Sequence, residues 1–232
     1  MEVDELSNDS TIGYLTDNES TIIFDEQDLT YIPKVSEIET KIDNIITSAN
    51  LGNNLNLKDI ALKIKDAEYN SNKSSTITIK SKGKKISLSI FSNGKMICSG
   101  AKSEKESKIA CEKFSKILRK LNINVEIKNF KIQNIIASYN TKFKISLSTL
   151  YNNLNFMNTK KDEINKNYCK YNKENFPGLI YFINESKISI VVFESGRVII
   201  SGSKKRKELN DILKNIYPFL VESRKINDSE EE

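Results

Sequence analysis

The 232-residue chain carries 36 Lys and Arg against 31 Asp and Glu, a net charge of +5, and it has no histidine. The lack of histidine removes the commonest general base and the commonest metal ligand. The three cysteines, Cys98, Cys111 and Cys169, lack the spacing of a zinc site or of a disulfide framework, and scattered cysteines suit a reducing compartment. No stretch approaches the roughly 18 apolar residues of a membrane span, and the amino terminus is acidic where a secretory signal is basic. We therefore expect no metal, no cofactor and no membrane association.

The charge is distributed unevenly along the chain. Residues 1–33 hold nine acidic residues and no Lys or Arg, so the rest carries 36 basic against 22 acidic residues, a balance of +14. A basic body with an acidic arm is typical of nucleic-acid-binding proteins, although lysines that only keep a surface soluble produce the same excess. We expect residues 1–35 to form a disordered arm. It is either an inert solvated tail or, because apolar residues such as Ile22, Ile23 and Phe24 lie among the acids, a mimic of DNA.

The first half of the basic body predicts a short helix, a hairpin and a long helix, in that order. Residues 55–64 have the pattern of the short helix. Residues 85–91 alternate and are rich in Ile and Leu, a Ser-Asn-Gly turn follows, and residues 95–99 form a second β-rich run, which together indicate a hairpin. Ser103 with Glu106 three residues later is a capping box, and apolar residues recur at helical spacing after it.

The second half repeats this pattern. Residues 187–204 (KISIVVFESGRVIISGSK) echo residues 85–102 (KISLSIFSNGKMICSGAK), and residues 44–50 return as residues 134–140. Residues 146–154 predict the second short helix, and an apolar stripe after Leu209 predicts the second long helix, whose end Pro218 should bend or shorten. Two copies make a pseudo-dimer within one chain, with a pseudo-two-fold axis that suits a nearly two-fold ligand such as duplex DNA.

These patterns predict an α+β fold with antiparallel strands on one face and helices on the other. From Asn134 to Phe193 there are 59 positions, against 47 from Asn44 to Phe91, so the second copy carries a polar insertion near residues 155–170. The expected units are the arm at residues 1–35, the first repeat at 36–125, the second repeat at 126–223 and an acidic tail at 224–232.

Longer motifs resemble a known family. Asn175–Tyr181 (NFPGLIY), Asn215–Pro218 (NIYP) and the Phe-x-x-Gly-Lys/Arg motifs that begin at Phe91 and Phe193 are similar to the core of the TATA-box-binding protein family. The resemblance covers residues 36–222 in both repeats, and residues 1–35 match nothing in the family. It implies a duplicated saddle, a curved antiparallel sheet whose concave face lies in a widened DNA minor groove while helices on the convex face stay open to partners. Because a minor groove offers few distinguishing groups at A·T pairs, its reader needs apolar surface, a few amides or hydroxyls and flanking cations.

The resemblance also implies roles for individual residues. Base contacts would come from Asn44 and Asn134 at the centre of the site, with Ile46, Ile97, Ile136 and Ile199 as an apolar floor and Ser99 and Ser201 as hydroxyls. Intercalation would come from Phe91, Phe176 and Phe193, and phosphate contacts from Lys73, Lys80, Lys95, Lys102, Arg197 and Lys204. Glu174 is what remains of the acidic patch that receives transcription factor IIB in the family.

The chain departs from the family at one end of the saddle. Phe176 lies 17 residues before Phe193, but 17 residues before Phe91 stands Ser74, so the fourth intercalating phenylalanine is missing. We expect a weaker stirrup, the loop at the end of the saddle, in the first repeat and a shallower DNA kink there, because unstacking needs an apolar group to fill the gap. Phe182 also stands where the family has a basic residue.

We predict a non-enzymatic general transcription initiation factor that binds A+T-rich, TATA-like promoter DNA in the minor groove, bends it and nucleates preinitiation complex assembly. By resemblance its partners are transcription factors IIB and IIA, TATA-binding-protein-associated factors and the RNA polymerase machinery. Its location would be the nucleus, or a cytoplasmic viral factory if the source is a large DNA virus. Two alternatives remain. One is a diverged paralogue that acts mainly through protein partners and recognises TATA weakly. The other is an enzyme on a related fold, as in DNA glycosylases, although no helix-hairpin-helix motif or carboxylate cluster is present.

Overall fold

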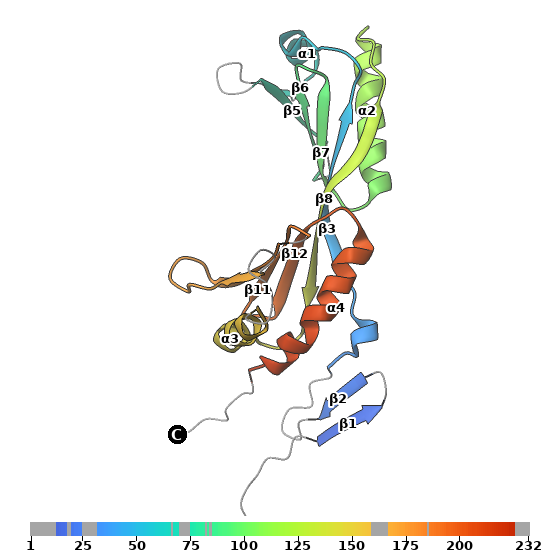
Figure 1. Ribbon diagram of the computed structural model, residues 1–232. Helices are drawn as coiled ribbons and strands as arrows, with labels where there is room; N and C mark the ends of the chain where they lie inside the picture. The colour runs from blue at the N-terminus through green and yellow to red at the C-terminus, as the bar shows by residue number, and fades with distance from the viewer. Residues whose placement is uncertain are drawn as a thin grey trace, which may run out of the picture.

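The computed structural model describes residues 13–17, 20–24, 32–65, 67–69, 75–81, 83, 85–158, 167–184 and 186–225, with the backbone alone at 13–17, 20–24 and 157–158. The first repeat contains η1 (Val35–Glu37), β3 (Lys41–Asn50), α1 (Leu57–Lys63), β4 (Ala67–Tyr69), β5 (Thr76–Lys80), β6 (Ser87–Phe91), β7 (Lys95–Ala101) and α2 (Glu104–Lys120) (Figure 1). The second contains β8 (Lys128–Asn140), α3 (Leu147–Asn158), β9 (Tyr168–Lys170), β10 (Gly178–Ile183), β11 (Ile188–Phe193), β12 (Arg197–Ser203) and α4 (Arg206–Glu222).

Two further strands lie in the segment for which the sequence predicts a disordered arm. β1 (Gly13–Asp17) and β2 (Ser20–Phe24) pair as a separate two-stranded antiparallel sheet. Both runs contain Thr and large aliphatic or aromatic residues, which favour extended backbone and outweigh the polar composition of the arm locally.

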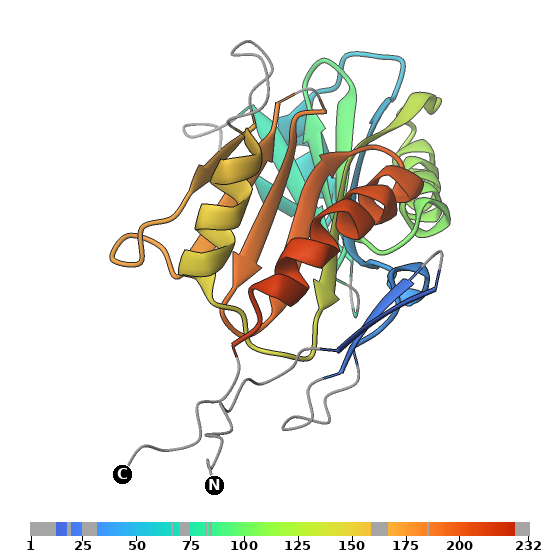
Figure 2. The ribbon, with the colours of Figure 1, turned by 60° about the horizontal axis from the view of Figure 1, so that its bottom comes forward.

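One continuous antiparallel sheet of ten strands holds the rest of the structure together, in the order β4-β5-β6-β7-β3-β8-β12-β11-β10-β9. β3 pairs with β8 at its centre, where Asn44 lies opposite Ile136 and Ile46 lies opposite Asn134. This reciprocal register places the pseudo-two-fold axis between the two strands. α2 and α4 lie on the same side of the sheet (Figure 1), and α3 and α4 cover the second repeat (Figure 2). The predicted α+β duplicated saddle is confirmed.

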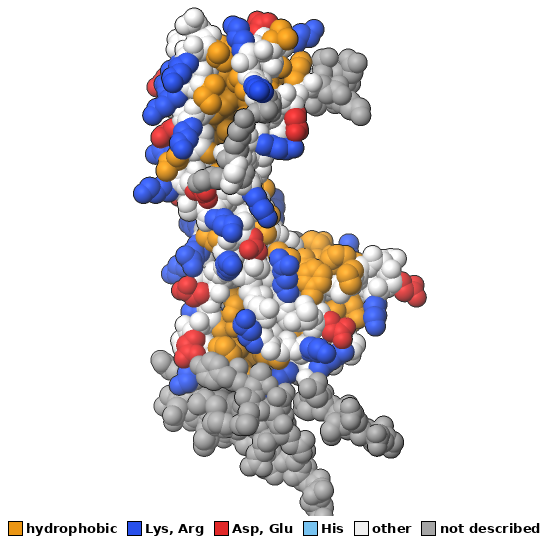
Figure 3. All heavy atoms as spheres, turned by 180° about the vertical axis from the view of Figure 1, so that it is seen from behind, with side chains coloured by type: hydrophobic (Ala, Val, Ile, Leu, Met, Phe, Trp, Pro, Cys, Tyr) orange, Lys and Arg blue, Asp and Glu red, His pale blue; other side chains and the backbone are white. Residues whose placement is uncertain are grey.

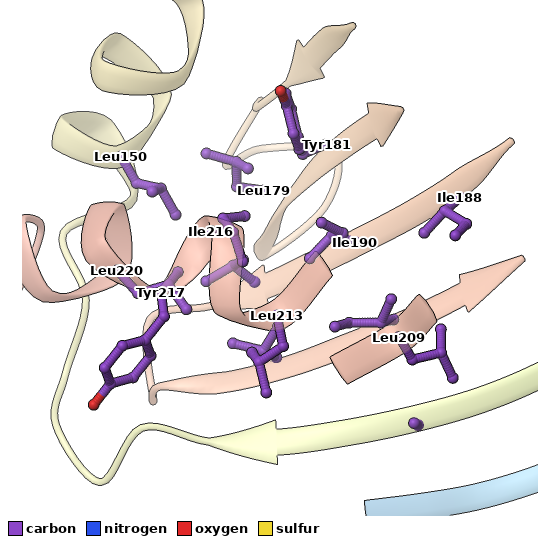
Figure 4. Packing of buried hydrophobic residues seen from close by; sticks show 14 of the residues in the cluster. Leu150, Leu179, Tyr181, Ile188, Ile190, Leu209, Leu213, Ile216, Tyr217 and Leu220 are labelled. Atoms are coloured by element: carbon purple, nitrogen blue, oxygen red, sulfur yellow. The ribbon is translucent and has the colours of Figure 1, made fainter. Parts of the chain in front are cut away.

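Alternation along the strands of the ten-stranded sheet decides which side chains face the helices. Leu179, Ile188 and Ile190 point from the strands of the second repeat toward Leu213 and Ile216 of α4 (Figure 4). All are buried, and a fully buried Leu or Ile side chain stabilises the fold by about 1.5–3 kcal/mol. The residues between them in the strands face the other way, so the sheet has one side covered by helices and one side bare.

The two repeats exchange the beginnings of their long central strands. Ile38 and Ile45 belong to the hydrophobic core of the second repeat, and Ile127 and Phe130 pack against the core of the first. The Asn210 Oδ1 on α4 accepts hydrogen bonds from the Thr40 backbone N–H at 3.0 Å and from its hydroxyl at 2.7 Å. Each half therefore contributes to the core of the other, and neither is an independent unit in space.

The helix ends follow the sequence signals with two exceptions. α3 continues to Asn158, four residues beyond its predicted end and into the polar insertion. α4 runs through Pro218 to Glu222, so the expectation that this proline shortens the helix is wrong. Pro218 is exposed, and a helix tolerates an exposed proline more easily because the carbonyl that loses its partner can meet water. Over the described part of the chain, no helix is both long enough and apolar enough to span a membrane.

The two long helices differ in their N-terminal caps, and this difference leads to a prediction about stability. The Ser103 Oγ accepts a hydrogen bond from the Glu106 backbone N–H at 3.1 Å, whereas Lys205, at the same position before α4, makes no side-chain cap. We expect Ser103→Ala to lower the free energy of unfolding by about 1 kcal/mol, because an amide at the start of α2 loses its acceptor. Lys205→Ala is the matched control and should change it by less than about 0.5 kcal/mol. Urea unfolding followed by circular dichroism measures both, and equal effects would contradict the capping role.

Candidate nucleic-acid interface

The bare side of the sheet gathers all eight residues that the sequence suggests for base contacts. We call this side the concave face; it contains Asn44, Ile46, Ile97, Ser99, Asn134, Ile136, Ile199 and Ser201, all half-buried. None of the four isoleucines packs into either hydrophobic core, although each adjoins a core residue along its strand. Figure 3 shows a hollow between the two repeats, and hydrophobic side chains gather on the second repeat beside this hollow. A contiguous exposed apolar patch rimmed by polar residues marks an interaction surface.

Both central asparagines are held in one orientation by a backbone amide. The Asn44 Oδ1 accepts a hydrogen bond from the Gly100 N–H at 2.6 Å, and the Asn134 Oδ1 accepts one from the Gly202 N–H at 2.8 Å. Since a backbone N–H can only donate, the amide oxygen of each side chain must face it, and Nδ2 is the group left to face outward. Each repeat therefore presents an amide donor at the centre of the concave face.

Only glycine fits at the two clamping positions. Gly100 has φ +89° and Gly202 has φ +113°, and a Cβ would lie 1.8 Å from the Lys85 carbonyl oxygen in the first case and 2.5 Å from the Lys187 carbonyl oxygen in the second. The pairing of these glycines with Asn44 and Asn134 depends on strand register and was not predicted from the sequence.

An aromatic pair occupies the outer end of the second repeat. The rings of Phe176 and Phe193 lie with centroids 5.9 Å apart at 58°, and Phe176 is 38% exposed. Gly178 makes room for the pair, because a Cβ there would lie 2.8 Å from the Phe176 Cε1. The Asn172 side chain and carbonyl accept hydrogen bonds from the backbone of Glu174, Asn175 and Phe176, which shapes the stirrup. Glu174 itself is exposed in this loop.

The outer end of the first repeat is described only in part. Phe91 lies opposite Thr76 in the sheet, and the Lys95 Nζ lies 5.9 Å from its ring centroid. Ser74 and Lys73 fall outside the described residues, so the missing aromatic wedge stays a prediction.

The predicted phosphate-contacting residues among the described ones are all exposed, but they are not equally placed. Lys80 forms an ion pair with Glu68 at 2.7 Å. Lys204 lines a cavity of about 1210 Å³ together with residues of α4. Lys95, Lys102 and Arg197 are exposed.

A carboxylate with three other lysines around it lies next to the aromatic pair. A hydrogen bond from Lys225 lowers the pKa of Glu194, next to Phe193, and the charges of Lys225, Lys173 and Lys144 lower it further. Glu194 therefore keeps a negative charge at neutral pH beside the aromatic pair.

Sequence reasoning missed a cation at the edge of the second repeat. Phe182, at the position for which the resemblance implies a basic residue, stacks on Tyr168 with centroids 4.6 Å apart. The Lys170 Nζ lies 5.5 Å from the Tyr168 centroid and 5.9 Å from the Phe182 centroid. The neighbouring strand β9 therefore places a positive charge at this edge. β9 lies at the end of the predicted polar insertion, so its pairing with β10 cannot be inferred from the sequence.

A curved antiparallel sheet with two central amide donors, an apolar floor and an aromatic pair at one end defines the class of proteins that bind the DNA minor groove with a β-sheet. The comparisons identify the family within this class. Residues 39–121 and 129–223 match the family described as "Transcription factor TFIID (or TATA-binding protein, TBP)". The chain belongs to the TATA-box-binding protein family.

Comparisons with individual relatives support this family assignment. The chain is 38% identical over 190 residues to the TATA-box-binding protein of Acanthamoeba castellanii, covering 82% of this chain and 69% of that one. It is 40% identical over 191 residues to TATA-box-binding protein 1 of Triticum aestivum, covering 82% and 77%. The solved structure of Methanococcus jannaschii TBP superposes with a TM-score of 0.64 at 29% identity, over 80% of this chain and 99% of that one. The protein is a non-enzymatic general transcription factor that binds TATA promoter DNA, as the sequence predicts.

The glycine that clamps Asn44 makes a testable contribution to stability. Gly100→Ala should lower the free energy of unfolding by at least about 2 kcal/mol, because the new Cβ meets a carbonyl oxygen and φ is positive. Gly83→Ala is the matched control: Gly83 has φ +71°, but a Cβ added there would meet no atom within 4 Å, so only the cost of about 1 kcal/mol for the backbone conformation remains. Urea unfolding distinguishes the two, and equal losses would show that the close approach contributes nothing.

Proposed function

We propose that the concave face binds the minor groove of TATA-like DNA with the Nδ2 groups of Asn44 and Asn134 directed at the central base pairs. The observation that carries this is the clamp on each amide oxygen, from Gly100 and Gly202. In the minor groove an A·T pair offers only acceptors, adenine N3 and thymine O2, whereas a G·C pair adds the guanine amine, a donor. Two fixed donors therefore favour A·T at the centre of the site.

The same proposal assigns roles to the outer residues. Ile46, Ile97, Ile136 and Ile199 form the apolar floor, Ser99 and Ser201 contribute hydroxyls, and the exposed basic residues contact phosphates. Phe176 and Phe193 insert at one end and Phe91 at the other, and unstacking a base step in this way bends the duplex. This assignment is supported by the exposure of Phe176 and its packing against Phe193.

Bent DNA held on one side leaves the helices of the convex side free for other factors. We infer that the protein nucleates preinitiation complex assembly there, with transcription factors IIB and IIA, TATA-binding-protein-associated factors and the RNA polymerase machinery as partners. Glu174, exposed on the second stirrup, is the proposed contact for transcription factor IIB. The eukaryotic relatives favour the nucleus as its location.

An isosteric substitution tests the donors directly. Asn44→Asp and Asn134→Asp keep an oxygen for the clamping glycine but replace the outward donor with a second carboxylate oxygen, which is repelled by the groove acceptors. We expect each to weaken binding to a TATA duplex at least about tenfold, since a good base contact contributes about 1–3 kcal/mol. Fluorescence anisotropy at fixed salt measures the affinity.

The control for added negative charge is Asn122→Asp. Asn122 is exposed just after α2 and has φ +61°, a conformation that aspartate tolerates as asparagine does. This variant should bind within about twofold of the wild type, because its charge lies at the end of a helix on the covered side of the sheet and away from the central base pairs. Unchanged TATA affinity for both Asn44→Asp and Asn134→Asp would overturn the proposed interface.

Salt dependence tests the phosphate contacts. If all six predicted basic residues engage, log K should fall with log[salt] at a slope of roughly −5, from about 0.9 per neutralised phosphate. Arg197→Gln should reduce the magnitude of the slope by about 0.9. Lys116→Gln, which removes an exposed charge from α2, should leave it unchanged. A wild-type slope near zero would mean that the basic excess serves solubility alone.

A further inference from the structure

The two halves of the concave face share one geometry but differ in polarity. In the first repeat, Thr78 lies opposite Ser89, and Ser89 lies opposite Ile97. In the second, the matching row is Ile180 opposite Val191 and Val191 opposite Ile199. Both rows end on a serine of the central strands, since Ile97 pairs with Ser48 and Ile199 pairs with Ser138. Two hydroxyls in one repeat therefore replace two aliphatic side chains in the other.

These side chains face away from the helices. The residues on either side of Ser89, Leu88 and Ile90, are buried in the first core, and those on either side of Val191, Ile190 and Val192, are buried in the second. Ser89 and Val191 themselves are half-buried and belong to neither core. Each lies two residues before the phenylalanine of its strand, so each would adjoin the base pairs beside a kink.

The difference in polarity matters because of the guanine amine. This group protrudes into the minor groove and is the only donor there. If Ile180 and Val191 covered the guanine amine, the amine would lose its water without gaining an acceptor, which costs the full desolvation penalty of a buried donor. Covered by Thr78 and Ser89, it could donate to a hydroxyl oxygen, and the smaller serine also leaves room for it.

We propose that the first repeat accepts a G·C base pair beside its kink and that the second repeat excludes one. The inference rests on the proposed placement of the minor groove against the concave face. It has a consequence for orientation. On a duplex with A·T at one end and G·C at the other, the protein binds with its first repeat over the G·C end, because the opposite orientation leaves the amine without a partner.

Three duplexes test the proposal: one with A·T pairs throughout, one with G·C at the outer base pair of one end, and one with G·C at both ends. The wild type should bind the first two within about threefold of each other, because it can turn its first repeat toward the single G·C pair. It should bind the third at least about tenfold more weakly, since one amine then lies under Ile180 and Val191 in either orientation.

Double substitutions that give one row the side chains of the other provide matched variants. Thr78→Ile with Ser89→Val makes the first row apolar like the second, and this protein should bind even the single-G·C duplex at least about fivefold more weakly than the A·T duplex. Ile180→Thr with Val191→Ser makes the second row polar, and this protein should regain affinity for the duplex with G·C at both ends. Retained affinity for the A·T duplex shows that each variant is folded.

Orientation is read by energy transfer. A donor dye at Lys120→Cys on α2, in a Cys169→Ser background, is paired with an acceptor on one end of the single-G·C duplex. Efficient transfer is expected only when the acceptor is on the G·C end. The inference is wrong if a G·C pair lowers the affinity of every variant equally and the orientation is random. The proposed interface still stands in that case, provided that the wild type binds the A·T duplex specifically. If Asn44→Asp and Asn134→Asp also leave A·T binding unchanged, the interface itself is wrong.

Discussion

The antiparallel pairing of β3 with β8 is the constraint on which the rest of the structure depends. These two strands join the repeats into one sheet, and each runs from the core of one repeat into the core of the other, as Ile45 and Phe130 show. Because the hydrogen bonds of this ladder and the two cores support one another, the halves cannot tilt independently without exposing apolar side chains. The shared sheet therefore sets the relative position of every group on the concave face.

The bare side of this sheet is the feature that makes the protein a ligand-binding surface. Sheets of this size usually cover both sides or expose a polar one. Here the exposed side carries the four half-buried floor isoleucines and the pair of Phe176 with Phe193, which the fold buries only in part. Exposure of these apolar side chains to water is unfavourable, and a DNA groove that covers them removes this free-energy cost. The hydroxyls and lysines around them limit self-association of the protein.

Duplication gave both repeats the same scaffold, and divergence then acted on the side chains of the bare side. The clamps are retained in both: Asn44 with Gly100 and Asn134 with Gly202 have matching contacts. The outer rows differ, with Thr78 in one repeat where the other has Ile180. Positions that maintain the sheet were kept similar because a positive φ or a close carbonyl allows only glycine, while outward positions meet no such steric limit.

The sequence by itself determined the duplication, the hairpins, the start of α2 at Ser103 and the family, because each depends on local patterning or on motifs that can be compared residue by residue. The four floor isoleucines came from the family resemblance, which assigns them position by position. Only the tertiary structure decided which way the asparagine amides point, that the repeats exchange strand beginnings, and that Lys170 places a charge over Phe182. Each of these depends on residues that are distant in the chain, such as Asn44 and Gly100 at a separation of 56 positions, and that strand register brings together. Register is set by the packing of the whole sheet and not by any local signal.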